Sequence, residues 1–167
     1  MVLVFMNDSF KVKNDLSCGF IALRRKEEWE VLLIDQVNSR NLNSYWTFPK
    51  GHQEGDETFL QTAKREFEEE VGISVKSVLT DKTFDMQYSF LFDKIKINKT
   101  VKLFLGFVDY NESQRIKPQI EEVKSLGWFN FSDSFKKLSH RNTKSLLKEI
   151  EVFIKTEEFD KFVNQSV

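Results

Sequence analysis

The feature that most constrains this chain is an acidic stretch from Gly51 to Ile73, GHQEGDETFLQTAKREFEEEVGI. Each residue of an α-helix advances about 100° around the axis, so Glu69 and Glu70 flank Glu66 at about 60° and 40°. Like charges this close on a helix repel one another, and a nearby cation would relieve that repulsion. The stretch therefore predicts a helix with three carboxylates on one face, ended by Gly72.

An apolar stripe lies beside this acidic face. It consists of Leu60, Ala63, Phe67 and Val71, and the helical spacing predicts that it is buried. Glu68 points nearly opposite Glu66 and is expected to face solvent.

Two interpretations of the acidic face remain open on these residues alone. Oxygen-only ligands suit a hard cation such as Mg²⁺ or Mn²⁺, and Mg²⁺ is commonly shared between carboxylates and substrate phosphates. The alternative is a solvated acidic face with no ligand, because runs of charge are usually exposed to water.

The spacing of the stretch resembles a known family motif. Gly51, five residues, Glu57, seven residues and then REFEEEVGI match the Nudix box, G-x5-E-x7-R-E-U-x-E-E-x-G-U, where U is a bulky apolar residue. Every fixed position matches, and Phe67 occupies the first U position. The chain is therefore identified, by resemblance, as a member of the Nudix hydrolases.

The resemblance implies a set of roles for the residues of this stretch. Mg²⁺, or Mn²⁺ in its place, would be held by Glu66, Glu69, Glu70 and the backbone carbonyl of Lys50. One of these glutamates would act as the catalytic base. Structural roles would fall to Gly51, Glu57, Arg65 and Gly72. A further catalytic glutamate from a later loop is expected at Glu122, with Glu121 as its neighbour in sequence.

The flanks of the box sharpen the resemblance over about residues 17–155. They resemble the asymmetric diadenosine tetraphosphate hydrolases at four segments, SCGFI at 17–21, WTFPKGH at 46–52, KTV at 99–101 and GWF at 127–129. This similarity implies a mixed sheet between helices, and cleavage of diadenosine tetraphosphate to ATP and AMP.

The same comparison suggests where a nucleotide would bind. Lys50 would contact phosphate, and His52 would either contact phosphate or cap its loop. Members of the resembled group stack adenine between two tyrosines. For the first, this chain offers Tyr88, Phe90 or Phe92, where Phe92 fits by counting back from Lys99 and Phe90 by counting forward from Gly72; the second position is Leu126. The phenylalanines can equally be core residues. Two interpretations of Lys94, Lys96 and Lys99 remain open. They form a basic ribbon that binds extra phosphates or an RNA 5′ end, or they belong to a hairpin that is only solvated.

The rest of the chain predicts one α+β domain, an α/β/α sandwich over residues 1–167. Strands are expected at 2–6, 18–24, 29–36, 76–81, 84–92, 99–109 and 126–129. Residues 37–45, 93–98 and 110–120 are expected as loops, 133–138 as a helical turn and 141–157 as a helix. The tail 158–167 is expected to be frayed unless Phe159 and Phe162 extend the apolar stripe of that helix.

Composition narrows the function classes. The 167 residues carry a net charge of −1, which argues against nonspecific nucleic-acid binding by the whole surface. The single cysteine, Cys18, excludes an internal disulfide and fits a reducing compartment. We expect a cytoplasmic chain, monomeric by default, with no leader, membrane span or membrane partner.

Three functional hypotheses follow. The first is hydrolysis of diadenosine polyphosphates. The second is another activity of the same family, on RNA 5′ ends or on nucleoside or inositol polyphosphates. The third is a catalytically inactive domain that only binds a nucleotide, which the intact carboxylates at 66, 69 and 70 argue against.

Overall fold

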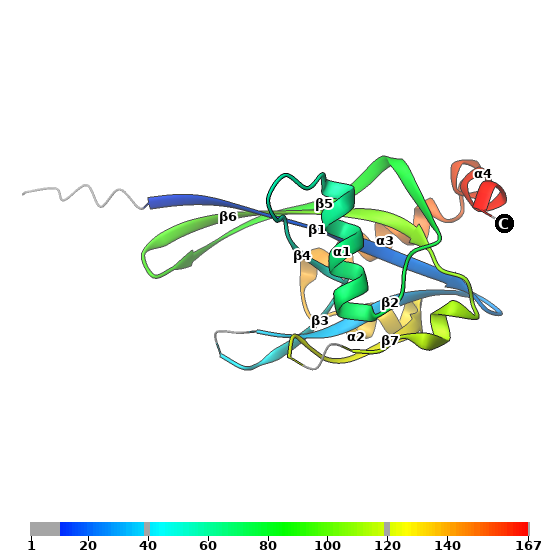
Figure 1. Ribbon diagram of the computed structural model, residues 1–167, viewed down its shortest axis with the longest axis horizontal. Coiled ribbons are helices and arrows are strands. Elements are labelled where there is room, and N and C mark those ends of the chain that lie inside the picture. Colours follow the sequence, from blue (N-terminus) through cyan, green and yellow to red (C-terminus); the bar gives the residue numbers. More distant parts are fainter. Residues whose placement is uncertain (1–10, 39–40, 119–120, 167) are drawn as a thin grey trace, which may run out of the picture.

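The computed structural model describes residues 11–38, 41–118 and 121–166. It confirms the predicted α+β architecture, a mixed sheet enclosed between helices (Figure 1). The sheet has seven strands: five follow the order β3-β2-β1-β6-β5, while β4 pairs with β1 and β7 pairs with β2. The strand expected at 2–6 lies outside the described residues.

The strands are β1 (Lys11–Arg25), β2 (Trp29–Val37), β3 (Ser44–Thr47), β4 (Lys50–His52), β5 (Ser77–Phe92), β6 (Ile95–Phe107) and β7 (Val123–Asn130). The helices are α1 (Phe59–Val71), the short 3₁₀-helix η1 (Glu112–Arg115), α2 (Phe131–Lys137), α3 (Arg141–Phe153) and α4 (Glu157–Ser166).

Strand β1 is the centre of the sheet and links its parts. It pairs in parallel with β6 from Lys11 to Leu23 and antiparallel with β2 at its other edge. Its middle also pairs with β4, the short strand that begins the acidic stretch. The position of the acidic stretch is therefore fixed by hydrogen bonds to the most interior strand.

Helix α1 covers one face of the sheet. It begins with a capping box, in which Thr58 and Gln61 exchange side-chain and backbone hydrogen bonds, and ends at Gly72 with φ +79°. Of the predicted apolar stripe, Ala63, Phe67 and Val71 are buried on the sheet and Leu60 is partly buried; Phe67 meets Phe20 edge to face at 5.6 Å. Burying a phenylalanine side chain contributes about 1.5–3 kcal/mol to folding stability. Burial of the apolar stripe therefore fixes the direction in which the acidic face of α1 points.

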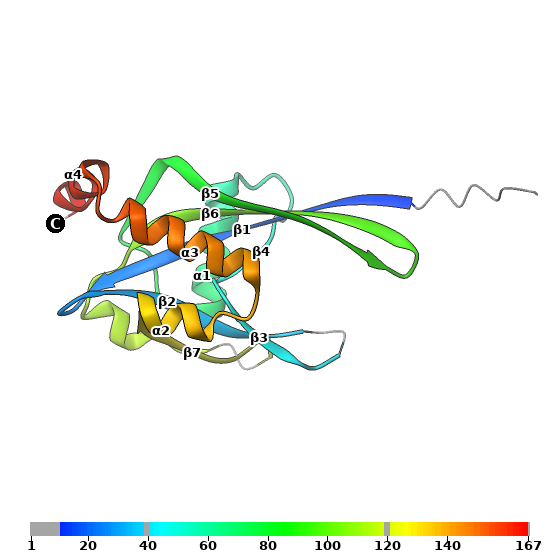
Figure 2. The same cartoon turned by 180° about the vertical axis from the view of Figure 1, so that it is seen from behind.

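Helices α2, α3 and α4 pack on the opposite face, as Figure 2 shows. Phe159 and Phe162 of α4 are buried, at 2% and 9% exposure. The tail therefore forms a helix where the sequence predicted fraying, because its two aromatic side chains complete the core beneath α3. Among the described residues, no helix is both long and apolar enough to cross a membrane.

Other segments also differ from expectation. Residues 37–45, expected as a loop, contain the first two residues of β3. The strands expected at 76–81 and 84–92 are one strand, β5, with a shift of register between Leu79 and Thr83. The turn expected at 93–98 is only Asp93 and Lys94, both with positive φ, as a two-residue hairpin requires. The helical turn expected at 133–138 is the full helix α2.

Candidate functional site

The most deeply buried carboxylate of the acidic helix is that of Glu70, at 1% exposure. Its Oε2 atom accepts the backbone N–H of Lys50 at 2.9 Å. Burial raises the pKa of Glu70, and this effect outweighs the lowering by Lys50. Ionising a buried carboxylate costs free energy because water is excluded from it. Positive charge beyond that of Lys50 would lower this cost.

The carboxylate of Glu66 lies directly against the backbone of Gly51. A Cβ atom at position 51 would stand 2.0 Å from the carboxyl carbon of Glu66, so a side chain at this position would displace the carboxylate. Glu66 is 9% exposed, and burial raises its pKa despite its hydrogen bond from Arg65. Glycine at the start of the box thus makes room for a carboxylate beside the Lys50–Gly51 backbone.

Arg65 ties the loop and the helix together. Its guanidinium holds Glu57 with two hydrogen bonds, Nε to Oε1 at 2.7 Å and Nη2 to Oε2 at 3.0 Å. It also donates to the His52 carbonyl at 2.7 Å and to Glu66 and Glu69 at 3.1 Å each. The hydrogen bond from Arg65 is the main reason that the pKa of Glu57 falls to about 2.

We expect Arg65→Lys to lower kcat/KM by about 10–100-fold, as changes to residues that orient metal ligands commonly do. A lysine cannot reproduce the planar fork that holds Glu57 while its other nitrogen contacts two further glutamates. Steady-state kinetics would measure the loss, and Lys64→Arg, at an exposed position one residue earlier, is the matched control. Unchanged kinetics in Arg65→Lys would show that this network does not orient the glutamates.

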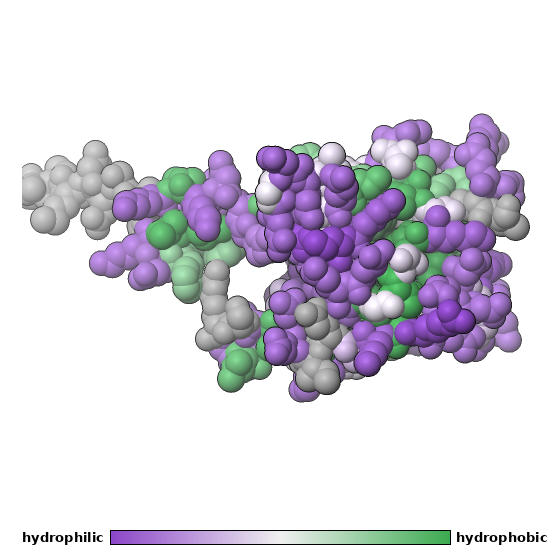
Figure 3. Space-filling model, viewed as in Figure 1, coloured by the Kyte–Doolittle hydropathy of each residue, from purple (hydrophilic) through white to green (hydrophobic). Residues whose placement is uncertain are grey.

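Two further predicted glutamates lie around the buried pair. Glu69 has a half-exposed side chain held by Arg65. The charge of Glu122 adds to the rise in pKa of both Glu66 and Glu70, and its backbone carbonyl accepts the N–H of Val37 at 2.9 Å. The surface over α1 is accordingly hydrophilic (Figure 3).

The chemistry of these donors decides whether a divalent cation fits them. In the described parts of the chain no three acidic, histidine or cysteine side chains already converge tightly enough to hold a metal ion. The available donors are nevertheless all oxygens, and two of them are buried carboxylates with raised pKa values. A hard divalent cation has the ligand preference and the charge that this set requires, so the residues fit it.

The side chain of Lys50 enters a small polar network. Its Nζ donates to Gln36 Oε1 at 2.8 Å, and the hydroxyl of Tyr45 donates to the same oxygen at 3.1 Å. Burial, then Tyr88 and Glu70, raise the pKa of Tyr45. Sequence reasoning missed Tyr45 and Gln36. Tyr45 directly precedes the WTFPKGH segment, but the polar run before it concealed the strand.

A second polar group lies beside β4. Lys99 is 8% exposed, and its Nζ contacts Asp15 Oδ2 at 2.9 Å, Ser17 Oγ at 2.7 Å and His52 Nε2 at 3.2 Å. Burial opposes ionisation of Asp15, but the hydrogen bonds from Lys99 and His52 hold its pKa below the ordinary value. The structure thus brings together Lys99 and His52, and adds Asp15, which the sequence did not single out.

The predicted basic ribbon is not a single surface. Residues alternate between the two faces of a strand, so Lys96 and Lys99 of β6 point to opposite sides. Lys94 occupies the hairpin turn. The ribbon interpretation was therefore wrong in its geometry, because a spacing of three residues separates side chains in a strand.

The aromatic candidates lie along β5. Tyr88 pairs with Lys99 in register, and its ring stacks with that of Phe90 at 6.2 Å. Phe92 is next to the hairpin turn, about 13 Å farther out along the strand at 3.3 Å per residue. Leu126 pairs with Ile34 and packs against the core under α1. The structure therefore places Tyr88, rather than Phe92 and Lys94, beside the polar groups.

Comparisons with known proteins agree with this arrangement. A family model described as NUDIX domain matches residues 13–149. A pig (Sus scrofa) bis(5′-nucleosyl)-tetraphosphatase (asymmetrical) is 29% identical over 147 residues, covering 83% of this chain and 94% of the relative. An m7GpppN-mRNA hydrolase of Saccharomyces cerevisiae is 27% identical over 139 residues, which cover 83% of this chain and 13% of that protein.

The fold is also found among solved structures. A C. elegans Ap4A hydrolase in a binary complex superposes with a TM-score of 0.68 at 23% identity, covering 84% of this chain and 97% of the other.

Proposed function

Because the chain belongs to the Nudix hydrolase family, whose members generally use divalent metal ions, we propose that it cleaves a phosphoanhydride bond in a dinucleoside polyphosphate. Diadenosine tetraphosphate, split into ATP and AMP, is the favoured substrate. The names of the pig, rat and mouse relatives support this choice, since each is an asymmetrical bis(5′-nucleosyl)-tetraphosphatase.

The observation that carries the proposal is the buried pair of carboxylates at the start of the box. Glu70 bonds the Lys50 N–H, and Glu66 fits against Gly51 where a side chain would exclude it. We assign Mg²⁺, or Mn²⁺, to Glu66, Glu69, Glu70 and the Lys50 carbonyl. A solvated acidic face would not require two of its carboxylates to be buried.

The chain's own residues supply the remaining parts of the reaction. A bound divalent cation would neutralise the anhydride oxygens and make the attacking water more acidic. We assign the proton of that water to Glu122, an exposed carboxylate whose charge acts on Glu66 and Glu70. Lys99 and His52 present positive charge and a ring nitrogen beside β4, where they would orient the phosphates.

We assign the nucleobase to the space between Tyr45 and Tyr88. The resembled enzymes place a tyrosine where this chain has Leu126, but Leu126 packs into the core here. Tyr45 is joined to Lys50 through Gln36, and an aromatic face stacks on any base. This assignment predicts that adenine is bound by stacking and that base selectivity is modest.

The proposed function is tested by incubating the protein and Mg²⁺ with a substrate panel and identifying the products by chromatography. ATP and AMP from diadenosine tetraphosphate, at a kcat/KM above that for ATP or ADP-ribose, is the expected result. Binding without turnover of any substrate would instead identify an inactive nucleotide-binding domain. Turnover only of 5′-triphosphorylated or capped RNA would replace the dinucleotide assignment with the second activity.

A further inference from the structure

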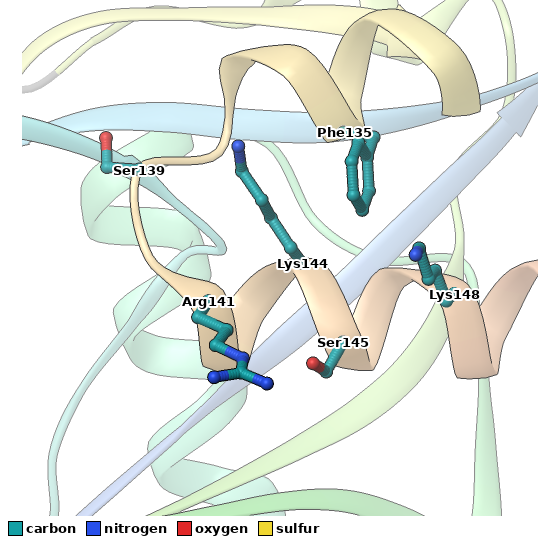
Figure 4. A pocket seen from close by; sticks show the side chains of 6 residues that line it. All are labelled: Phe135, Ser139, Arg141, Lys144, Ser145 and Lys148. Atoms are coloured by element: carbon teal, nitrogen blue, oxygen red, sulfur yellow. The ribbon is translucent and has the colours of Figure 1, made fainter.

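Helices α2 and α3 lie on the face of the sheet opposite α1 (Figure 2), and residues of both, with Ser139 between them, line a basic groove. It encloses a cavity of about 450 Å³ lined by Phe135, Ser139, Arg141, Lys144, Ser145 and Lys148. Three of these six residues are cationic and none is acidic. Figure 4 shows Lys144 extending from α3 toward the segment that carries Ser139, while Phe135 and Lys148 lie close together between the helices.

The charges of this groove are not neutralised by the protein. Within the described residues, Arg141, Lys144 and Lys148 form no ion pair, although the whole chain has a net charge of only −1. The nearby carboxylates Asp133 and Glu151 are each paired with another lysine. The positive charge is therefore concentrated at one place and available to an anion.

Helix α3 adds to the positive electrostatic potential of the groove. Its first turn contains no acidic residue, and its N-cap His140 makes no side-chain capping hydrogen bond. The first-turn N–H groups and the helix dipole favour a phosphate at this end. Ser139 and Ser145 add hydroxyl groups, one on each side of the helix start.

His140, between the groove residues Ser139 and Arg141 in sequence, links one end of the groove to the polar network of Lys50. The His140 ring lies 5.2 Å from the ring of Tyr45, and Tyr45 shares the Gln36 oxygen with Lys50. From Arg141 to Lys148 the basic stripe runs about 10 Å along α3, at 1.5 Å per residue. A ligand that follows this path would leave the catalytic site over aromatic rings and then meet successive cations.

We propose that this groove binds the phosphate backbone of a single-stranded nucleic acid. A positively charged track with aromatic side chains for stacking is the arrangement that such strands use. The exposed His140 supplies a ring at the start of α3, and the three cations supply the backbone contacts. The inference goes beyond the small-nucleotide activity, and it does not depend on which substrate is hydrolysed.

The test is fluorescence anisotropy with a 3′-labelled twelve-residue oligouridylate, in EDTA so that no cleavage occurs. Wild-type protein is expected to bind, with affinity falling steeply as salt rises. Lys144→Glu with Lys148→Glu should weaken binding at least tenfold and reduce the salt slope by about 0.7 for each phosphate that the protein no longer neutralises. Lys26→Glu with Lys161→Glu, at exposed positions outside the groove, makes the same change in net charge and should preserve affinity.

The ammonium groups of Lys144 and Lys148 also cover the Phe135 ring, so the glutamate variant could lose binding through a folding defect. The milder double variant Lys144→Gln with Lys148→Gln controls for this. It should weaken binding in the same direction, with an unchanged thermal midpoint and unchanged hydrolysis of diadenosine tetraphosphate. No binding by the wild type, or equal losses in the groove and control variants, would overturn the proposal. Binding by a protein that hydrolyses none of the panel would leave the groove intact and remove only the proposed activity.

Discussion

Glu70→Gln is expected to lower kcat by about 10²–10⁴-fold, the range associated with loss of a group that acts on a proton or on developing charge. Glutamine keeps an oxygen that can accept the N–H of Lys50 at 2.9 Å, so the backbone there should be held as before. The substitution removes the negative charge of Glu70, which we propose binds the cation. Folding should be unimpaired, because burial disfavours that charge in the protein alone.

Steady-state kinetics with diadenosine tetraphosphate would measure this effect, and urea denaturation would verify stability. Glu68→Gln is the matched control, since Glu68 lies on the same helix but is exposed and bonded to Ser74 at 2.7 Å. It should leave kcat unchanged. A folded Glu70→Gln protein with wild-type turnover would remove Glu70 from the cation site.

Removal of divalent cations is expected to abolish hydrolysis, and Mg²⁺ should restore it along a saturable curve. The reason is that Glu66 and Glu70 bring buried charge together without enough positive charge from the chain. The cation should also stabilise the fold, by about 2.7 kcal/mol at a concentration of 100 times its Kd. Activity and thermal unfolding with and without EDTA would measure both effects.

Glu66→Gln provides the variant for this experiment. Its half-saturating Mg²⁺ concentration should rise, and calorimetric titration with Mn²⁺ should show weaker binding independently of turnover. Full activity in EDTA, or Mn²⁺ binding that is the same in Glu66→Gln and wild type, would contradict the assignment of the cation to these carboxylates.

The sequence predicted those parts of the protein that depend on local spacing. The acidic face of α1, its apolar stripe and Gly72 at its end all follow from helical periodicity within 23 residues. The arrangement of Arg65 and Glu57 follows from a fixed spacing and from the shape of the guanidinium group. These features need no knowledge of the rest of the chain.

Features that depend on distant pairing were not predictable in the same way. Tyr45 reaches the site only because β3 pairs with β2, and the strand itself begins within a polar run. Lys99 is drawn inward by Asp15 and Ser17, which are more than eighty residues away in sequence. The spacing of Phe159 and Phe162 left open whether the tail folds, and the core surface on which α4 packs is built by residues distant in sequence.

The central place of β1 has a consequence for how the protein acquires its activity. The acidic stretch is complete by Ile73, yet β1, which holds β4, gains its parallel partner only when β6 has been made, between Ile95 and Phe107. Joining strands so far apart in sequence requires a large loss of chain entropy before the contacts form, which slows folding. Synthesis must therefore run well past the catalytic segment before that segment has a rigid support.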